Sequence, residues 1–247
     1  MKNMTSVPHK IKRQAVFNWS GGKDSALALY YALQDEDCQV KKLLTSVNGA
    51  YNRVTMHGVR LEVLQEQARR IGIPLKLLIL PGQPDMAAYE EAMKAAIGEL
   101  RQEGITHGIF GDLFLEDVRR YRESKLAAAG MKALFPLWKK DTTETLHEFL
   151  DLGFKTMLVC VDASKLDSGF CGRIIDRDFI KDLPRGVDPC GENGEFHTFV
   201  FDGPIFKNPV YFEKGETVLR EYDSPGGKGG KSSFWFTDIR LKKAEAL

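Results

Sequence analysis

The sequence predicts an α/β protein: a parallel sheet with helices on both faces, followed by a smaller C-terminal mixed α/β domain. In the first part, short apolar runs of strand length alternate with helix-length segments, which is typical of a covered parallel sheet. Beyond residues 134–138, strand-like segments follow one another and glycine becomes frequent. We therefore expect two domains, residues 1–140 and residues 141–247.

The elements of the first part are apolar runs and apolar stripes that end at turn residues. The run at 15–19 leads into a glycine-rich turn, and the stripe at 86–100 stops before Gly104. Taken in order, we expect strands at 15–19, 39–47, 74–80 and 107–110, and helices at 26–33, 59–71 and 86–100, with an Arg- and Ala-rich helix ending near Gly130.

The second part begins with a helix that Asp141 or Thr142 caps. Alternating or clustered apolar residues then predict several strands, with turns at Gly203-Pro204 and Lys214-Gly215. The glycine- and lysine-rich segment 225–233 looks like the end of a Walker A loop but lacks the first glycine of that motif. We therefore expect this segment to form a hairpin. The expected strands are 157–161, 196–201, 210–212, 218–222 and 234–241.

Composition argues against several classes of protein. The 247 residues are 43% hydrophobic and 28% charged with a formal net charge of +1, so we expect no nucleic-acid partner. Residues 1–14 lack the apolar stretch of a signal peptide, and no apolar run reaches membrane-spanning length. The four cysteines include no Cys-x-x-Cys pair, which argues against a disulfide framework or a zinc ribbon. We expect a cytoplasmic protein with no membrane partner.

A glycine-rich turn, Ser-Gly-Gly-Lys-Asp-Ser, lies between the first expected strand and helix. Glycines let the backbone approach a ligand closely, and the N-terminus of a helix presents N–H groups and a positive dipole end to an anion. The spacing is not that of a Walker A loop, and a carboxylate after the lysine suits a metal ion beside phosphates. We call residues 20–25 the glycine turn. Its expected nucleotide-binding residues are Ser20, Gly21, Gly22, Lys23, Asp24 and Ser25, with Asp24 as a ligand of Mg²⁺.

Two further segments carry polar residues that could contribute to the same site. Asp112 follows the strand at 107–110 as Ser20 follows the first strand, and ligands of parallel sheets bind at such carboxyl ends. Residues 188–198 read Asp-Pro-Cys-Gly-Glu-Asn-Gly-Glu-Phe-His-Thr. By composition alone, this second segment is as compatible with a simple polar turn as with a functional loop. We call residues 188–195 the acidic loop.

The glycine turn resembles the signature of the PP-loop ATP pyrophosphatases, which cleave ATP between the α and β phosphates. Turn and acidic loop together resemble the diphthine–ammonia ligase family, in which a Glu-Gly-Gly-Glu-type loop of the second domain faces the nucleotide. The resemblance covers nearly the whole chain and implies a PP-loop, HUP-like sheet. It includes Asn-Arg-Val-Thr-Met-His at 52–57, Gly-Asp-Leu at 111–113, Arg119 with Glu123, and Leu-Phe-Pro-Leu-Trp at 134–138.

This resemblance implies a ligation in two steps that uses ATP and Mg²⁺. An acceptor carboxylate attacks the α-phosphorus and releases pyrophosphate; ammonia then attacks the acyl-adenylate and releases AMP. Lys23 and Asp24 would act on the phosphates and the metal ion, and Glu192 and Glu195 would bind ammonium or accept its proton. Further nucleotide contacts are assigned to His57, Gly111 and Asp112, and acceptor contacts to Arg119, Asn193, Gly194, His197 and Thr198.

Two residues depart from the diphthamide-making branch of that family and indicate a bacterial-like branch. Asn193 replaces a glycine, and His197 stands where that branch carries an acidic residue. The loop that positions the acceptor has therefore changed its charge and hydrogen bonding. The acceptor stays open between a protein-borne carboxylate such as diphthine and a small molecule such as a cobalamin-salvage intermediate.

Other functions are less well supported. A PP-loop enzyme that modifies tRNA would commonly need paired cysteines for thiolation and a basic appendage for RNA. A protein that only senses a nucleotide, without catalysis, would have no evident need for the Asp24 carboxylate. The weakest interpretation gives a catalytic or metal-binding role to the cysteines. In it, Cys190 and His197 form a nucleophile–base pair, or bind a metal ion together with Cys171. The oligomeric state is undecided, with a homodimer as one alternative.

Overall fold

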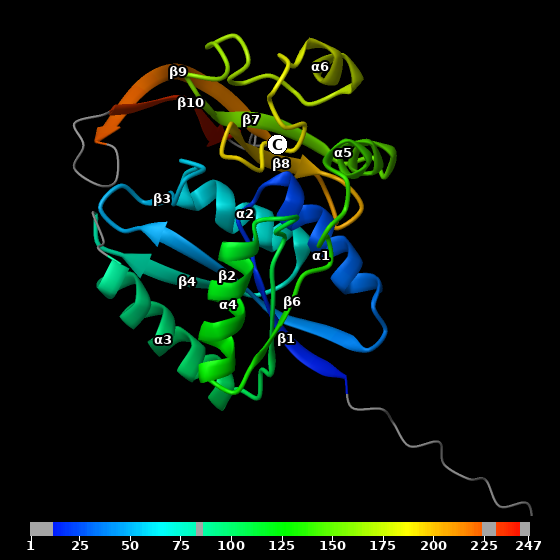
Figure 1. Cartoon of the computed structure of the whole chain (residues 1–247), viewed down its shortest axis with the longest axis vertical. Helices are drawn as coiled ribbons and strands as arrows, with labels where there is room; N and C mark the ends of the chain where they lie inside the picture. The colour runs from blue at the N-terminus through cyan, green and yellow to red at the C-terminus, as the bar shows by residue number, and fades with distance from the viewer. Residues whose placement is uncertain (1–11, 83–85, 224–230, 243–247) are drawn as a thin grey trace, which may run out of the picture.

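A mostly parallel sheet forms the base of the molecule (Figure 1). The computed structural model describes residues 12–82, 86–223 and 231–242. Within these ranges the strand order is β3-β2-β1-β5-β6, with β4 also paired to β2. Only β3 runs antiparallel, against the end of β2. The strands are β1 (Arg13–Asn18), β2 (Cys38–Asn48), β3 (Arg53–Val54), β4 (Leu75–Leu80), β5 (His107–Ile109) and β6 (Lys132–Leu134).

Helices cover both faces of this sheet, as the alternation of strand side chains requires. In β1, Ala15 and Phe17 belong to the core on the side of α1 (Lys23–Gln34) and α2 (Leu61–Ile71). Val16 instead belongs to the core that includes residues of α3 (Met86–Gln102) and α4 (Glu116–Ala128). The predicted class, α/β with a covered parallel sheet, is confirmed.

The second part of the chain forms an antiparallel sheet in the order β8-β7-β10-β9. Asp141 caps its first helix, because its side chain accepts a hydrogen bond from the Glu144 N–H (3.0 Å). Helices α1 and α2 lie between the two sheets, and one hydrophobic core contains residues from both parts (Figure 1). The elements are α5 (Thr142–Asp151), β7 (Lys155–Asp162), α6 (Arg177–Asp182), β8 (Phe196–Asp202), β9 (Phe212–Asp223) and β10 (Lys231–Leu241).

One predicted turn is wrong. The expected strands at 210–212 and 218–222 form a single strand, β9, which continues through Gly215. Lys214 pairs with Ile239 and Thr217 with Thr237, so Gly215 and its neighbour lie opposite Asp238 in a β-bulge. The glycine therefore bends the strand instead of ending it. Strands β3 and β6 and helix α6 are additional short elements that local pattern did not predict.

Two further expectations are not decided by the structure. The hairpin predicted at 225–233 falls largely on residues 224–230, outside the described ranges. The domain boundary near residue 140 stays a prediction. No helix within the described ranges is long and apolar enough to cross a membrane.

An ion-pair cluster ties the antiparallel sheet to the first part of the chain. The Asp238 carboxylate on β10 accepts hydrogen bonds from Arg53 Nη2 (3.0 Å) and from Arg60 Nε and Nη2 (2.9 and 2.8 Å). Arg240 Nε adds a fourth at 3.1 Å. Burial by itself raises the pKa of Asp238, but the arginine hydrogen bonds outweigh it and hold this pKa well below its usual range.

We predict that Asp238→Asn lowers the free energy of unfolding by about 2 kcal/mol at pH 7, because a charge-assisted network is lost. A carboxyl whose folded pKa is depressed contributes stability above its unfolded pKa, near 3.8, and this contribution disappears as the pH falls. Urea unfolding should therefore show a difference between variant and parent that shrinks from pH 7 to pH 3. Asp178→Asn, which breaks an exposed pair with Lys181, is the control; an equal effect there would contradict the prediction.

Candidate active site

The glycine turn occupies the point where the strand order of the parallel sheet reverses. β1 pairs with β2 on one side and with β5 on the other. The connections after β1 and β5 therefore diverge, and ligands of open α/β sheets bind in the crevice formed there. Gly111 lies at the same edge, because a Cβ at this position would be 3.0 Å from the backbone of Asp24. The structure thus brings the turn and residues 111–112 together, as the sequence predicts.

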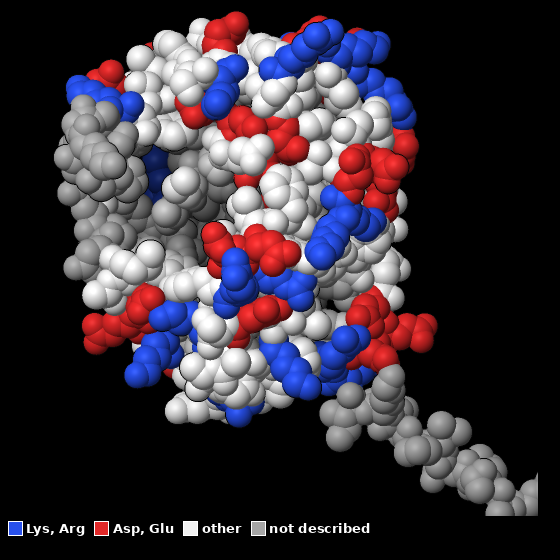
Figure 2. All heavy atoms as spheres, viewed as in Figure 1, with Lys and Arg blue, Asp and Glu red and all other residues white. Residues whose placement is uncertain are grey.

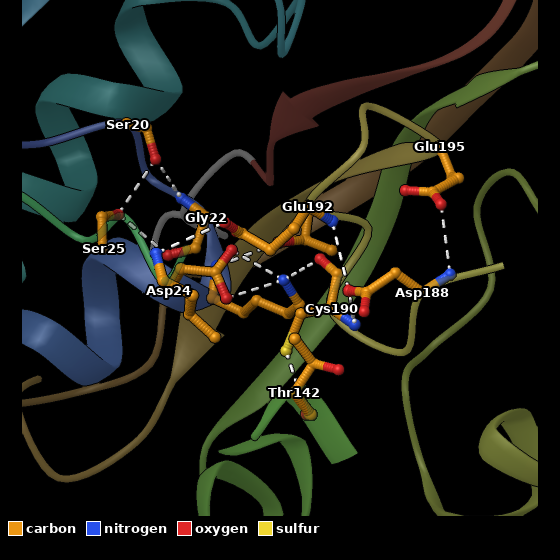
Figure 3. A network of polar contacts seen from close by, with 12 residues as sticks. Ser20, Gly22, Asp24, Ser25, Thr142, Asp188, Cys190, Glu192 and Glu195 are labelled. Carbon is orange, nitrogen blue, oxygen red and sulfur yellow. Dashed lines mark hydrogen bonds and ion pairs between the residues drawn. The ribbon is translucent and has the colours of Figure 1, made fainter. Parts of the chain in front are cut away.

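The conformation of the turn depends on its two glycines. Gly21 has φ of 82°, in the left-handed region that favours glycine, and Gly22 is the N-cap of α1. Ser20 Oγ accepts a hydrogen bond from the Gly22 N–H (3.2 Å) and lies 3.0 Å from Ser25 Oγ, which donates to the Gly22 carbonyl (2.9 Å). The two hydroxyls close the turn on itself (Figure 3).

Strand β8 of the other sheet packs directly on the glycine turn. The Val200 N–H donates to the Gly21 carbonyl (2.9 Å), and the Lys23 N–H donates to Thr198 Oγ1 (2.9 Å). His57 Nδ1 lies 2.9 Å from the Thr198 carbonyl. These contacts place the start of β8, and the acidic loop before it, over the N-terminus of α1.

The Lys23 side chain points into the acidic loop. It is 4% exposed, and its Nζ donates to both Asp24 carboxylate oxygens (2.8 and 2.7 Å) and to the Cys190 carbonyl. Burial by itself lowers the pKa of Lys23, but Asp24 and the other nearby acidic groups outweigh it and raise this pKa. Lys23 is therefore a buried cation that joins the turn to the loop.

Three carboxyl groups from distant parts of the sequence meet beside this cation. Burial, and then the negative charge of Asp24, raises the pKa of Glu192 to about 8; Asp112 contributes in the same direction. Burial also raises the pKa of Asp112, which Arg122 opposes from 3.2 Å. In Figure 3, Glu192 extends from the acidic loop toward Asp24. The Glu192 carboxyl therefore has a pKa far above the usual range of a glutamate.

Two histidine rings contact each other in a tilted arrangement between the two sheets. The ring centroids of His57 and His197 are 4.8 Å apart. Burial lowers the pKa of His57 to about 4, and burial together with His57 lowers that of His197 to about 3. Both rings are uncharged at pH 7, so they pack beside the turn without adding positive charge.

Glu195 is not brought to the turn. Its carboxylate accepts hydrogen bonds from the backbone N–H groups of Asp188 (3.1 Å) and Asn193 (3.0 Å) and from Asn193 Nδ2 (3.1 Å). Figure 3 shows it beyond Asp188, away from Asp24. Glu195 and Asn193 thus brace the acidic loop internally, with Gly194 in a left-handed conformation (φ 86°) between them.

The predicted acceptor contact Arg119 is also held elsewhere. Its guanidinium stacks on Trp138, 4.6 Å from the ring centroid, and pairs with Glu123 (2.8 Å). The arginine that reaches the carboxyl cluster is Arg122, one turn later in α4. Local sequence could not separate these two positions, because both lie in one Arg-rich run whose orientation is set by packing.

Sequence reasoning also missed Gln67 and Asp188. Gln67 is buried in α2 and bonds to the glycine turn, and Asp188 Oδ1 accepts from the N–H groups of Cys190 (2.8 Å) and Glu192 (3.2 Å). A glutamine inside the apolar stripe of an amphipathic helix was a signal that could have indicated the first. An aspartate at the start of a loop is too common to indicate the second.

The cysteines have structural environments. Cys190 Sγ donates to the Thr142 carbonyl (3.2 Å), and burial raises the pKa of its thiol, which disfavours the nucleophilic thiolate. Cys171 Sγ contacts the Trp235 carbonyl (3.3 Å). Within the described ranges, no group of three or more His, Cys, Asp or Glu residues is arranged to hold a metal ion by itself.

The face in Figure 2 is hollowed between strands β9 and β10 and the region of β3. Lys and Arg side chains alternate with Asp and Glu over the same face, without one extended patch of a single sign. The expectation of no nucleic-acid partner stays a prediction.

The strand order of the parallel sheet and the conformation of the glycine turn define an α/β protein of the PP-loop class. The chain belongs to the diphthamide synthase family: residues 12–133 match the model of the diphthamide synthase N-terminal domain, and residues 141–223 match that of the C-terminal domain. It is 29% identical to the human (Homo sapiens) diphthine–ammonia ligase over 140 residues, 54% of this chain and 51% of the human protein.

Two other relatives show the same similarity. The zebrafish (Danio rerio) diphthine–ammonia ligase is 28% identical over 172 residues, 64% of this chain and 68% of the relative. The bovine (Bos taurus) protein of that name is 28% identical over 140 residues, 54% of this chain and 51% of the relative. The chain thus spans about half the length of the human and bovine proteins that it matches.

Proposed function

We propose that the protein is an ATP-dependent ligase that joins ammonia to an acceptor carboxylate and releases AMP and pyrophosphate. One observation carries the proposal: the acidic loop closes on the glycine turn through Lys23, which contacts Asp24 and the Cys190 carbonyl at once. A nucleotide cradle on one sheet and a titratable carboxyl on a loop of the other then share one site. Family membership and the names of the relatives support the same chemistry.

The phosphates of ATP would bind at the N-terminus of α1. Gly22 is the N-cap there, and its N–H now donates to Ser20 Oγ, an acceptor that a phosphate oxygen can replace. The hydroxyls of Ser20 and Ser25 and the ammonium of Lys23 would stabilise the charge that develops on the leaving pyrophosphate. The acceptor oxygen attacks the α-phosphorus, and the bond to the bridging oxygen breaks.

The carboxyl cluster fits a magnesium ion. Asp112 Oδ2 is buried and has no hydrogen-bond partner within the described ranges, and Asp24 is its acidic neighbour. Mg²⁺ commonly binds to one or two carboxylates together with substrate phosphates, so a complete protein cage is unnecessary. We propose that Asp24 and Asp112 hold it. When bound, it neutralises phosphate charge during the displacement.

Glu192 is the proposed base of the second step. Ammonia arrives in neutral water largely as ammonium, and a carboxylate that titrates near pH 8 can accept its proton. The nitrogen then attacks the acyl carbon, and AMP leaves. Glu195, which braces the loop, would act on this step only by holding Glu192 in place.

The relatives' name makes diphthine the first acceptor to test. A small-molecule carboxylate is the alternative, since Asn193 and His197 depart from the diphthamide-making pattern.

We predict that incubation with ATP, Mg²⁺, ammonium and a carboxylate acceptor yields AMP and pyrophosphate in equal amounts. Labelled ATP separated by chromatography measures this directly, with diphthine-bearing elongation factor and small carboxylic acids as parallel acceptors. Omission of ammonium should prevent formation of the amide product. Formation of ADP, or ATP cleavage that depends on tRNA, would contradict the proposed reaction.

A further inference from the structure

Gln67 is a polar residue at a position where the rest of its helix face is apolar. Its neighbours in α2, Val63, Leu64, Ala68 and Ile71, belong to the hydrophobic core, and Gln67 itself is 0% exposed. A buried amide is unfavourable unless hydrogen bonds compensate it. The Nε2 group of Gln67 makes such hydrogen bonds, whereas its buried Oε1 has no partner within the described ranges.

Those contacts join the glycine turn to β8. Gln67 Nε2 donates to the Gly21 carbonyl (3.0 Å) and to the Val200 carbonyl (2.6 Å). The Val200 N–H donates to the same Gly21 carbonyl (2.9 Å). One side-chain amide thus links three elements: α2, the turn after β1, and β8.

The Gly21 carbonyl matters because it belongs to the peptide unit that carries the Gly22 N–H. A trans peptide is planar, so its C=O and N–H point in opposite directions. When Gln67 and Val200 hold the carbonyl on one side, the Gly22 N–H is directed to the other, toward Ser20 Oγ. Gln67 Oε1 would lie only 2.6 Å from a Cβ at Gly21, so the same side chain also requires glycine there.

The link continues to the acidic loop. Thr198 accepts from the Lys23 N–H and is two residues before Val200, and the loop ends where β8 begins. Any rotation of the Gly21–Gly22 peptide that improves or impairs phosphate binding must therefore change hydrogen bonds of β8.

We propose that Gln67 is a positioning residue that orients the Gly21–Gly22 peptide for phosphate binding and couples nucleotide occupancy to the acidic loop. The inference rests on the proposed function, because it takes the nucleotide to bind at the turn.

Two variants and a matched control test the role. Gln67→Leu removes both donated hydrogen bonds at similar volume, and Gln67→Glu keeps the shape but faces the two carbonyls with a carboxyl group. Gln65→Leu changes the same residue type at an exposed position of the same helix. Calorimetry with Mg–ATP, steady-state kinetics of AMP formation and amide hydrogen exchange with and without Mg–ATP are measured on each full-length protein.

In the parent protein, Mg–ATP should slow exchange in both residues 20–25 and residues 188–198. Gln67→Leu should weaken Mg–ATP binding at least tenfold, lower kcat at least tenfold, and confine the remaining protection to residues 20–25. Gln65→Leu should match the parent. If Gln67→Leu fails to fold, Gln67→Glu decides: its turnover relative to the parent should rise as the pH falls, because a protonated carboxyl can again donate one hydrogen bond.

The outcomes distinguish a failure of the proposed function from a failure of the positioning role of Gln67. No Mg–ATP binding by the parent would overturn the proposed function, and the inference with it. Normal Mg–ATP affinity and protection of residues 188–198 in a folded Gln67 variant would overturn the positioning role alone. A variant that only melts at a lower temperature, with unchanged affinity and kcat, would show that Gln67 merely stabilises the fold.

Discussion

Replacing Lys23 with alanine should lower ATP cleavage at least about a thousandfold and reduce the free energy of unfolding by about 3 kcal/mol. The first effect follows because Lys23 is the cationic side chain of the glycine turn itself. The second follows because the change leaves the partly buried Asp24 without its partner and the Cys190 carbonyl without its donor. The stability effect is expected because the Lys23 side chain is only 4% exposed.

A double variant separates the two effects. Lys23→Met with Asp24→Asn removes both charges of the pair, so stability should return toward that of the parent while turnover stays lost. Lys41→Ala, on an exposed part of β2, is the control for loss of a lysine. Chemical unfolding and AMP formation measure the two quantities. Turnover within tenfold of the parent in Lys23→Ala would remove the turn from the mechanism.

Glu192→Gln should reduce turnover with ammonium by about 10²- to 10⁴-fold, the usual contribution of a general base. Because the pKa of Glu192 is raised to about 8, the parent gains its ionised form as the pH rises from 6 to 9. The ratio of kcat/KM between parent and variant should therefore increase over this range. The ratio cancels the titration of ammonium itself, and a ratio that is flat with pH would contradict the assignment.

The same raised pKa has a consequence for stability. A carboxyl whose folded pKa lies above its unfolded value stabilises the fold below the unfolded pKa, near 4.5, and this contribution is lost as the pH rises through about 8. Glu192→Gln cannot ionise, so it should be more stable than the parent at pH 9 and similar at pH 5. Glu216→Gln, at an exposed position of β9, should show neither change.

Much of the fold follows from local pattern. The apolar runs predicted β1, β2, β4 and β5 within a few residues, because a strand buried on both faces needs a nearly continuous apolar run. The turn predicted at Lys214-Gly215 failed, because a glycine in a bulge and a glycine in a hairpin look alike in sequence. Short elements such as β6 have too few residues to show a period.

The predictions for the site also divide into those that local sequence supports and those that need the tertiary structure. The glycine turn was predictable, since its chemistry lies within six consecutive residues whose types each have a reason. The order of residues places Glu192 and Glu195 in one loop, but it could not show that Glu192 faces Asp24 while Glu195 points away. Neighbouring residues of a loop can point in opposite directions, and hydrogen bonds to the loop's own backbone decide which does.

Residue order alone was thus enough to predict a phosphate-binding turn, the alternation of strands and helices, and a family resemblance. All three are local or repetitive properties of the chain. The approach of Asp24, Asp112 and Glu192, the contact of Lys23 with the Cys190 carbonyl, and the link through Gln67 required the tertiary structure. These residues are far apart in sequence, and they meet because one hydrophobic core packs β8 and its loop against the N-terminus of α1.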